Sequence, residues 1–95
     1  MKKTTEETSI KQGIKKWLKL KGWFVFHNLA GLGCYPGLSD FTAVKDGKVL
    51  FIEVKTPKGK QSDNQMQFDI DISTAGGYYL VARGHEDIEE FLERI

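Results

Sequence analysis

The chain has 95 residues, of which 40% are hydrophobic and 12% aromatic. It can therefore form one domain with a modest core, and it is not a disordered tail. Its apolar runs fall short of the roughly 20 residues that span a bilayer, and its single cysteine, Cys34, cannot form an internal disulfide. We expect a cytoplasmic protein without a membrane partner, and the formal net charge of +1 does not by itself indicate nucleic acid.

The distribution of charge is more informative than its sum. Residues 1–22 contain seven lysines and two glutamates, a local charge of +5, whereas residues 85–95 contain five acids and one arginine, a local charge of −4. The basic start, with Lys11 and Lys15, is a candidate surface for binding phosphates. The alternative is that both segments are ordinary solvated helix faces.

The first helix is expected over residues 5–21, because its apolar positions recur at helical spacing. At about 100° per residue, Glu7 falls within roughly 40° of the centre of the apolar stripe, so we expect it on the buried side. A carboxylate there needs a partner such as a metal ion or a lysine. Alternatively, Glu6 and Glu7 only interact favourably with the helix dipole.

A short strand is expected over residues 23–27, which are rich in aromatic and β-branched side chains. His27 could point into a functional site, or it could simply be hydrogen-bonded at the strand end. Residues 28–38 form a glycine-rich loop without the spacing of a nucleotide-binding motif. We expect this loop to be a rim that lets a phosphate backbone come close.

Two apolar runs, residues 41–44 and 49–54, flank the dipeptide Asp46-Gly47, which is a strong signal for a β-hairpin. A two-residue turn places Asp40 opposite Glu53, with Cβ atoms about 4.5–5.5 Å apart, where like charges are destabilising. A divalent cation between the carboxylates would relieve that repulsion. A bulge or a three-residue loop would instead send Asp40 to the other face of the sheet.

Side chains that alternate along the second strand put Lys55 on the same face as Glu53. Two acids and a lysine therefore meet at one end of the hairpin, which is typical of a metal-dependent hydrolytic site. The loop that follows carries Lys58 and Lys60 beside this site, and we expect both lysines to contact the phosphate backbone of a scissile strand.

A second helix begins at Ser62, because Ser62 and Gln65 form the S-x-x-Q pattern of a capping box. Gln65 could serve only as a capping residue, or its amide could also be aimed at a phosphate. A strand over residues 78–83 and a helix over residues 86–95 complete the chain. We predict a single α/β domain over residues 1–95, with the order α-β-β-β-α-β-α and a mixed sheet.

The residues Asp40, Glu53-Val54-Lys55 and Gln65 resemble the motif of the PD-(D/E)XK nuclease superfamily. Within that superfamily, residues 7–83 resemble a VRR-NUC (virus-type replication-repair nuclease) domain, through the segments 36–40 and 49–59. Ser39 stands where the superfamily name has proline. The resemblance implies a restriction-endonuclease-like core.

The resemblance also implies roles for these residues. Asp40, Glu53 and the backbone carbonyl of Val54 would bind Mg²⁺ or Mn²⁺, and Glu7 would add a further carboxylate directly or through water. Lys55 would orient the attacking water or stabilise developing charge. Gln65 would help to hold the nucleophile or the phosphate.

The function implied is a structure-selective DNA endonuclease that acts on branched or junction DNA as a homodimer, in a bacterial or phage-infected cell. One alternative is a non-catalytic DNA-binding module, but the presence of Asp40, Glu53 and Lys55 together argues against it. Another is a hydrolase of small phosphoesters, against which the basic loop and the missing deep-pocket signature argue.

Overall fold

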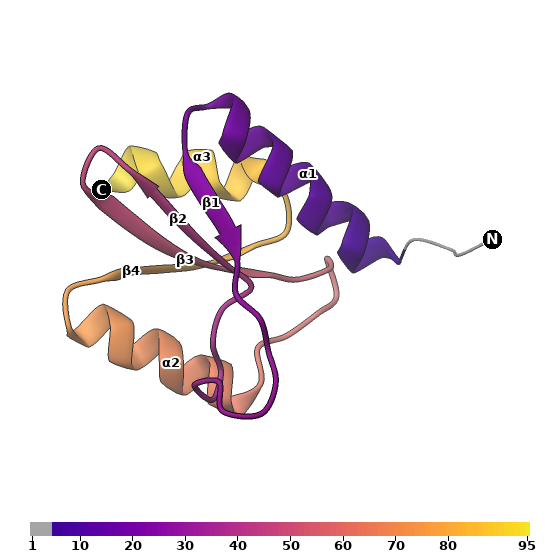
Figure 1. Ribbon diagram of the computed structural model, residues 1–95, viewed down its shortest axis with the longest axis vertical. Helices are drawn as coiled ribbons and strands as arrows, with labels where there is room; N and C mark the ends of the chain where they lie inside the picture. Colours follow the sequence, from indigo (N-terminus) through magenta and orange to yellow (C-terminus); the bar gives the residue numbers. More distant parts are fainter. Residues whose placement is uncertain (1–4) are drawn as a thin grey trace.

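The computed structural model describes residues 5–95. Within this part of the chain the order of elements is the predicted one, α-β-β-β-α-β-α (Figure 1). The elements are α1 (Glu6–Leu20), β1 (Phe24–His27), β2 (Phe41–Lys45), β3 (Lys48–Val54), α2 (Asp63–Thr74), β4 (Tyr78–Ala82) and α3 (His85–Arg94). No helix in residues 5–95 has both the length and the apolar character that crossing a membrane requires.

The four strands form one mixed sheet in the order β1-β2-β3-β4. Strand β2 is antiparallel to both of its neighbours, β1 and β3, whereas β4 runs parallel to β3. Parallel neighbours need a crossover connection, and α2 supplies it between β3 and β4. The predicted mixed sheet is confirmed.

The β2–β3 hairpin has the two-residue turn that the sequence predicts. Asp46 and Gly47 have φ angles of 50° and 80°, the left-handed values of a type I′ turn. The turn pairs Lys45 with Lys48 and sets the register of the whole ladder, in which Thr42 faces Phe51. The predicted register is therefore confirmed, and the alternative with a bulge is wrong.

The two faces of the sheet are covered unequally. Helices α1 and α3 lie next to each other and pack on one face, where they enclose the main core (Figure 1). Helix α2 packs on the other face through Phe68, whose ring meets those of Phe51 and Tyr79 edge-on. The core residues that are fully buried and apolar include Ile14, Leu18, Ala43, Leu50, Ile52, Val54, Ala82 and Ile88.

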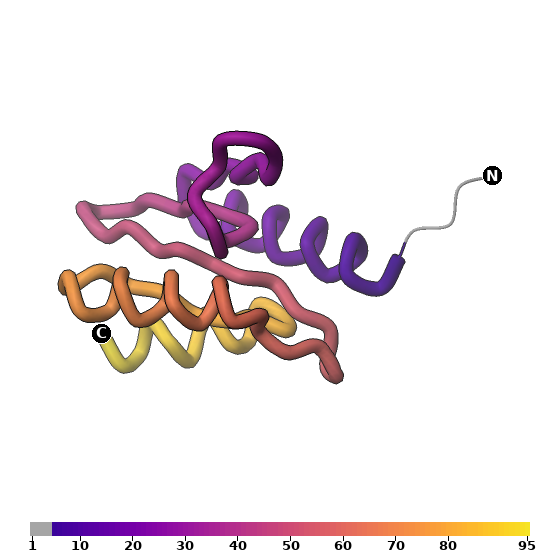
Figure 2. The backbone as a smooth tube through the Cα atoms, turned by 90° about the horizontal axis from the view of Figure 1, so that it is seen from below, coloured from indigo at the N-terminus to yellow at the C-terminus, as the bar shows by residue number. Residues whose placement is uncertain are grey.

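The loop of residues 28–40 leaves the sheet as a wide arch (Figure 2) and is fixed to α2 through Gly37. Gly37 has a φ of +79°, and a Cβ atom built on it would lie 2.1 Å from the backbone oxygen of Asn64. Only glycine fits this close approach of two backbones. Gly33, in the same loop, has a φ of +89° but no atom within 4 Å of its hypothetical Cβ.

We predict that Gly37→Ala destabilises the protein more than Gly33→Ala, which serves as the matched control. Both substitutions force a left-handed backbone on alanine, at a cost of roughly 1–2 kcal/mol. Gly37→Ala adds a collision with the first turn of α2, for which we expect about 1–3 kcal/mol more. Urea unfolding measures both losses, and equal losses would contradict a tight contact at Gly37.

Candidate active site

The candidate site lies where β2 begins and β3 ends. Asp40 directly precedes β2, and its backbone oxygen accepts a hydrogen bond of 2.7 Å from the Asn28 N–H, which continues the β1–β2 pairing. Glu53 is the last residue but one of β3 and is only 3% exposed. Since Phe41 pairs with Ile52, the same register brings Asp40 opposite Glu53, as predicted.

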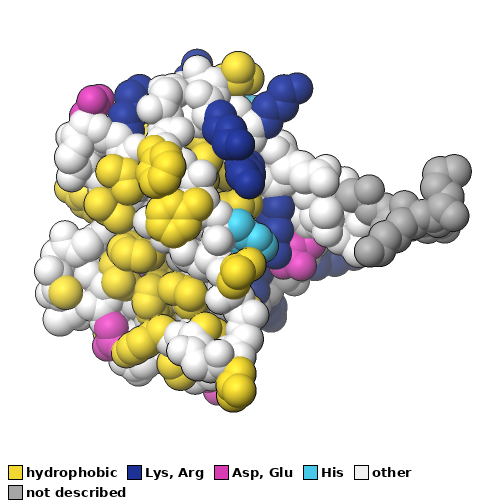
Figure 3. Space-filling model, viewed as in Figure 1, with side chains coloured by type: hydrophobic (Ala, Val, Ile, Leu, Met, Phe, Trp, Pro, Cys, Tyr) yellow, Lys and Arg dark blue, Asp and Glu magenta, His cyan; other side chains and the backbone are white. Residues whose placement is uncertain are grey.

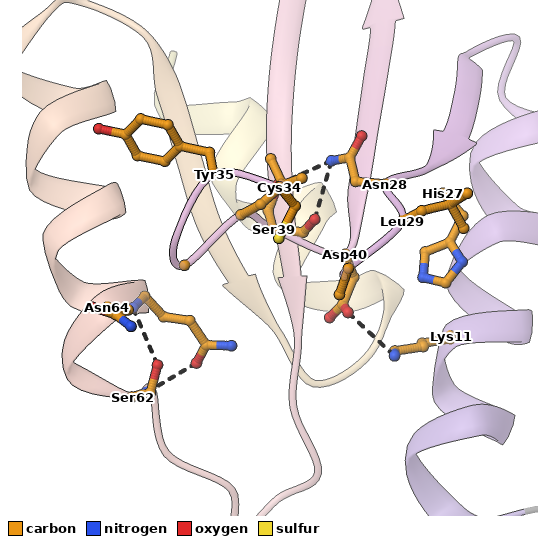
Figure 4. A pocket seen from close by; sticks show the side chains of 14 residues that line it. Lys11, His27, Asn28, Leu29, Cys34, Tyr35, Ser39, Asp40, Ser62 and Asn64 are labelled. Carbon is orange, nitrogen blue, oxygen red and sulfur yellow. Dashed lines mark hydrogen bonds and ion pairs between the residues drawn. The ribbon is translucent and has the colours of Figure 1, made fainter. Parts of the chain in front are cut away.

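Both oxygens of the Asp40 carboxylate have partners. Oδ2 accepts a hydrogen bond of 2.7 Å from the backbone N–H of Val54. Oδ1 lies 3.2 Å from the Nζ atom of Lys11, which reaches the site from α1 (Figure 4). The aspartate is therefore held by β3 on one side and by a helix on the other.

The Glu53 carboxylate is bound through one oxygen only. Its Oε2 accepts a hydrogen bond of 2.9 Å from Gln65 Nε2 and lies 3.3 Å from Lys55 Nζ. Its Oε1 is buried and has no hydrogen-bond partner among the described residues. Leaving a buried carboxylate oxygen unsatisfied is costly, so this atom is the strongest indication that the site suits a cation.

The surroundings of Glu53 disfavour its charged form. Burial is the largest cause and the negative charge of Asp40 is the second; together they raise the pKa of Glu53 from 4.5 to about 7, although Lys55 acts in the opposite direction. A cation bound beside both carboxylates would reverse this shift.

The structure confirms the first role predicted for Gln65, that of a capping residue, whereas a role in holding a phosphate stays a prediction. Its backbone N–H donates a hydrogen bond of 3.2 Å to Ser62 Oγ, and its side-chain Oε1 accepts one of 2.9 Å from the backbone N–H of Ser62. The two bonds form a capping box. Its Nε2 is not used by the cap and donates a hydrogen bond to Glu53 Oε2. The cap thus orients the amide, and the same side chain links the start of α2 to the carboxylate pair.

A cavity of about 510 Å³ opens beside Asp40 and Gln65. Lys11 and His27 line it from one side and the loop 28–40 from another (Figure 4). His27 is an exposed residue whose ring packs against that of Phe41, with centroids 5.2 Å apart. It therefore lies in the cavity wall without a hydrogen bond among the described residues.

Asn28, which had no predicted role, fixes the backbone ahead of Asp40. Its Nδ2 donates to the backbone oxygen of Ser39 at 3.0 Å, and its Oδ1 accepts a hydrogen bond from Thr42 Oγ1 at 3.1 Å. The one available signal was its place directly after a short strand, where a polar side chain can tie a loop to the neighbouring strand.

The structure does not bring Glu7 to the carboxylate pair. Glu7 is exposed in the first turn of α1 and has no ion pair among residues 5–95. Its predicted burial is wrong, because the apolar stripe of α1 meets the core only from Ile10, which is partly buried, and is fully buried from Ile14. A role for Glu7 as a ligand stays a prediction.

The remaining predicted residues are accessible to a large ligand. Lys58 and Lys60 are exposed in the loop after β3, and Lys15 is half-buried on α1. The backbone oxygen of Gly59 accepts a hydrogen bond of 2.7 Å from Arg83 Nη2, so this basic loop is tied to the end of β4.

The residues at the site fit a hard divalent cation. Two carboxylates converge, one buried oxygen lacks a partner, and oxygen donors are the ligands that Mg²⁺ and Mn²⁺ prefer. In the described part of the chain no group of three acidic, histidine or cysteine side chains is close enough to bind a metal. Asp40, Glu53 and the backbone carbonyl of Val54 are therefore the ligands to consider.

We predict that the metal-free protein loses stability as the pH rises from about 4.5 to about 7, because the unfolded chain ionises Glu53 first while the folded protein keeps it protonated. In Glu53→Gln this loss should be smaller. At pH 8 in chelator the variant should exceed wild type by about 1 kcal/mol or more, roughly 4–8 °C in Tm.

Thermal unfolding between pH 5 and pH 8 measures the difference. Glu93→Gln is the control, because Glu93 is exposed at the end of α3. The same pH dependence in wild type and Glu53→Gln would contradict a strained Glu53 carboxylate.

Comparison with known proteins supports the fold. No family model and no curated protein matches the sequence. Among solved structures, one described as a VRR_NUC domain is similar, with a TM-score of 0.79 and 21% sequence identity. The similarity covers 94% of this chain and 96% of that one. The chain therefore has the fold of a VRR_NUC domain, as the resemblance of its motifs implied.

Proposed function

We propose that the protein is a metal-dependent endonuclease that hydrolyses phosphodiester bonds in branched or junction DNA, in the cytoplasm of a bacterial or phage-infected cell. One observation carries the proposal: the Asp40 and Glu53 carboxylates converge on a VRR_NUC fold with an unpartnered buried oxygen, and the Lys55 ammonium lies 3.3 Å from Glu53. This combination of acids and a lysine suits phosphodiester hydrolysis.

Asp40, Glu53 and the Val54 carbonyl would hold Mg²⁺ or Mn²⁺, which when bound makes water more acidic and offsets negative charge on the phosphate. The chain fixes these ligands in advance. The Val54 N–H holds Asp40, and the Gln65 amide holds Glu53. Such preorganisation lowers the cost of binding a cation between them. Glu7 could add its carboxylate only by a movement of the first turn of α1.

Lys55 would act on the reacting groups. Its side chain is 15% exposed, so its ammonium is largely shielded from solvent while it pairs with Glu53. We assign it two tasks, orienting the attacking water and stabilising negative charge that develops on the phosphate.

Three lysines, two of them exposed and one half-buried, would bind the DNA backbone on either side of the site. Lys58 and Lys60 follow β3, and Lys15 lies on α1 beyond Lys11. None of these side chains reads bases, so we expect affinity that depends on DNA shape and falls steeply as salt rises.

The test is cleavage of labelled four-way junction, flap, single-stranded and duplex DNA, with Mg²⁺, with Mn²⁺ and with chelator. We expect cutting of branched DNA in either metal and none in chelator. Asp40→Asn, Glu53→Gln and Lys55→Ala should each lower the rate by about 10²-fold or more. Glu93→Gln should cut at the wild-type rate.

The possible outcomes separate the candidate functions. DNA binding without cutting in either metal would leave only the non-catalytic module. Hydrolysis of small phosphoesters that is indifferent to salt would favour the other alternative. Cutting of unbranched duplex as fast as junctions would contradict structure selectivity.

The proposal includes a homodimer, because one chain offers one site and symmetric cutting of two strands needs two. An apolar surface is available for it. Phe24 and Phe26 of β1 are 67% and 44% exposed, on the face where α2 covers only β3 and β4, and Val49 of β3 is 39% exposed. Figure 3 shows hydrophobic side chains gathered on this side of the molecule.

We predict that the double substitution Phe24→Glu and Phe26→Glu converts a dimer into a monomer, measured by light scattering coupled to gel filtration. Charges placed in an apolar interface lose their water without gaining partners. Leu20→Glu is the control, since Leu20 is 76% exposed but lies at the end of α1, away from this face. A monomeric wild type would contradict the homodimer.

A further inference from the structure

Lys11 occupies an unusual position for a lysine on a surface helix. Its Nζ lies 3.2 Å from Asp40 Oδ1, and the two side chains are only 26% and 17% exposed. It lines the same cavity as Asp40 and His27 (Figure 4). An ion pair this shielded is screened less by salt than one on the open surface.

The pair matters because of how Asp40 is bound on its other side. Oδ2 is taken by the Val54 N–H at 2.7 Å, so Oδ1 is the oxygen with the greater freedom to meet a cation. That oxygen already has the Lys11 ammonium beside it. Two cations on one carboxylate oxygen repel each other, and the repulsion grows as water is excluded.

We propose that Lys11 is the resident counter-cation of Asp40, that it leaves this carboxylate when a divalent ion binds, and that its freed ammonium then binds a phosphate of the DNA. Lys11 would thereby couple the binding of metal to the binding of DNA. The inference rests on the proposed function and adds a regulatory step to the same site.

The choice of phosphate follows from geometry and charge. Lys11 is anchored on α1, and its side chain lines the cavity that borders Asp40. An ammonium that has lost its carboxylate in a shielded place needs another anion, and a DNA phosphate next to the site supplies one. Lys11 would then touch the substrate, whereas in the metal-free protein it only neutralises Asp40.

Lys15 provides a matched comparison for the metal-free protein. It lies one turn further along α1, carries the same charge and is half-buried, but it has no ion pair among residues 5–95. If Lys11→Met changes the metal affinity only by lowering the net charge of the helix, Lys15→Met should therefore change it by the same amount.

The first measurement is calorimetric titration of Mg²⁺ and Mn²⁺ into protein without DNA. We expect Lys11→Met to bind the ion about tenfold more tightly than wild type, because a competing cation is gone, and Lys15→Met to stay within about twofold. Lys11→Gln is a second variant that removes the charge with similar helix propensity. Circular dichroism verifies that each variant is folded.

The second measurement is affinity for junction DNA in Ca²⁺ and in chelator. In wild type and Lys11→Arg the ion should strengthen DNA binding, and in Lys11→Met this gain should shrink by about tenfold. A purely structural role for Lys11 would weaken DNA binding equally in both conditions, which would overturn the coupling.

Unchanged metal affinity in both Lys11→Met and Lys11→Gln would overturn the inference, and so would an equal change in Lys15→Met. In either case, metal binding by the wild-type protein would still agree with the proposed nuclease function. A wild-type protein that binds neither ion would contradict the metal site itself, and the inference would fall with it.

Discussion

The register of the β2–β3 hairpin is the constraint on which the site depends. The left-handed turn at Asp46-Gly47 fixes it, and every later pairing follows, including the approach of Asp40 to Glu53. A slip of one residue would turn the whole set of side chains to the opposite faces and would bury charges in the core. Because the register is local, the chain can establish it before the helices assemble.

The two carboxylates are held by partners from three elements, α1, β3 and α2, and by the residue that follows β3. A backbone N–H of β3 and the lysine of α1 bind Asp40, while the residue after β3 and the first turn of α2 bind Glu53. This arrangement opposes the repulsion between the acids without cancelling it, since one oxygen of Glu53 stays buried and unbound. The large core between the sheet and helices α1 and α3 offsets that cost.

Most structural features that depend on residues close together in the chain were predicted from the sequence. Helical spacing, the Asp-Gly turn and the capping box at Ser62 gave the elements, the hairpin register and the position of Gln65, because each depends on neighbours in the chain. Burial of Glu7 was predicted wrongly, since helical period says which face a residue is on but not how far the sheet extends beneath it. The Lys11–Asp40 pair joins residues from different elements, and only the packing of α1 beside the hairpin reveals it. The contact between Gly37 and Asn64 could likewise not be predicted. A glycine in a loop indicates that the backbone can adopt unusual conformations, but it does not indicate which other segment of the chain packs against it.

The backbone of the arch of residues 28–40 is attached to the rest of the molecule near its two ends. Asn28 ties one end to β2, and Gly37 packs against α2 three residues before Asp40, while the Tyr35 ring packs on Phe68 of α2. Between these attachments the chain is exposed, from Leu29 to Pro36. Changes in the length or composition of this span add little closure entropy and leave Asp40 in place. The rim of the cavity can therefore change in shape without moving the carboxylate pair beneath it.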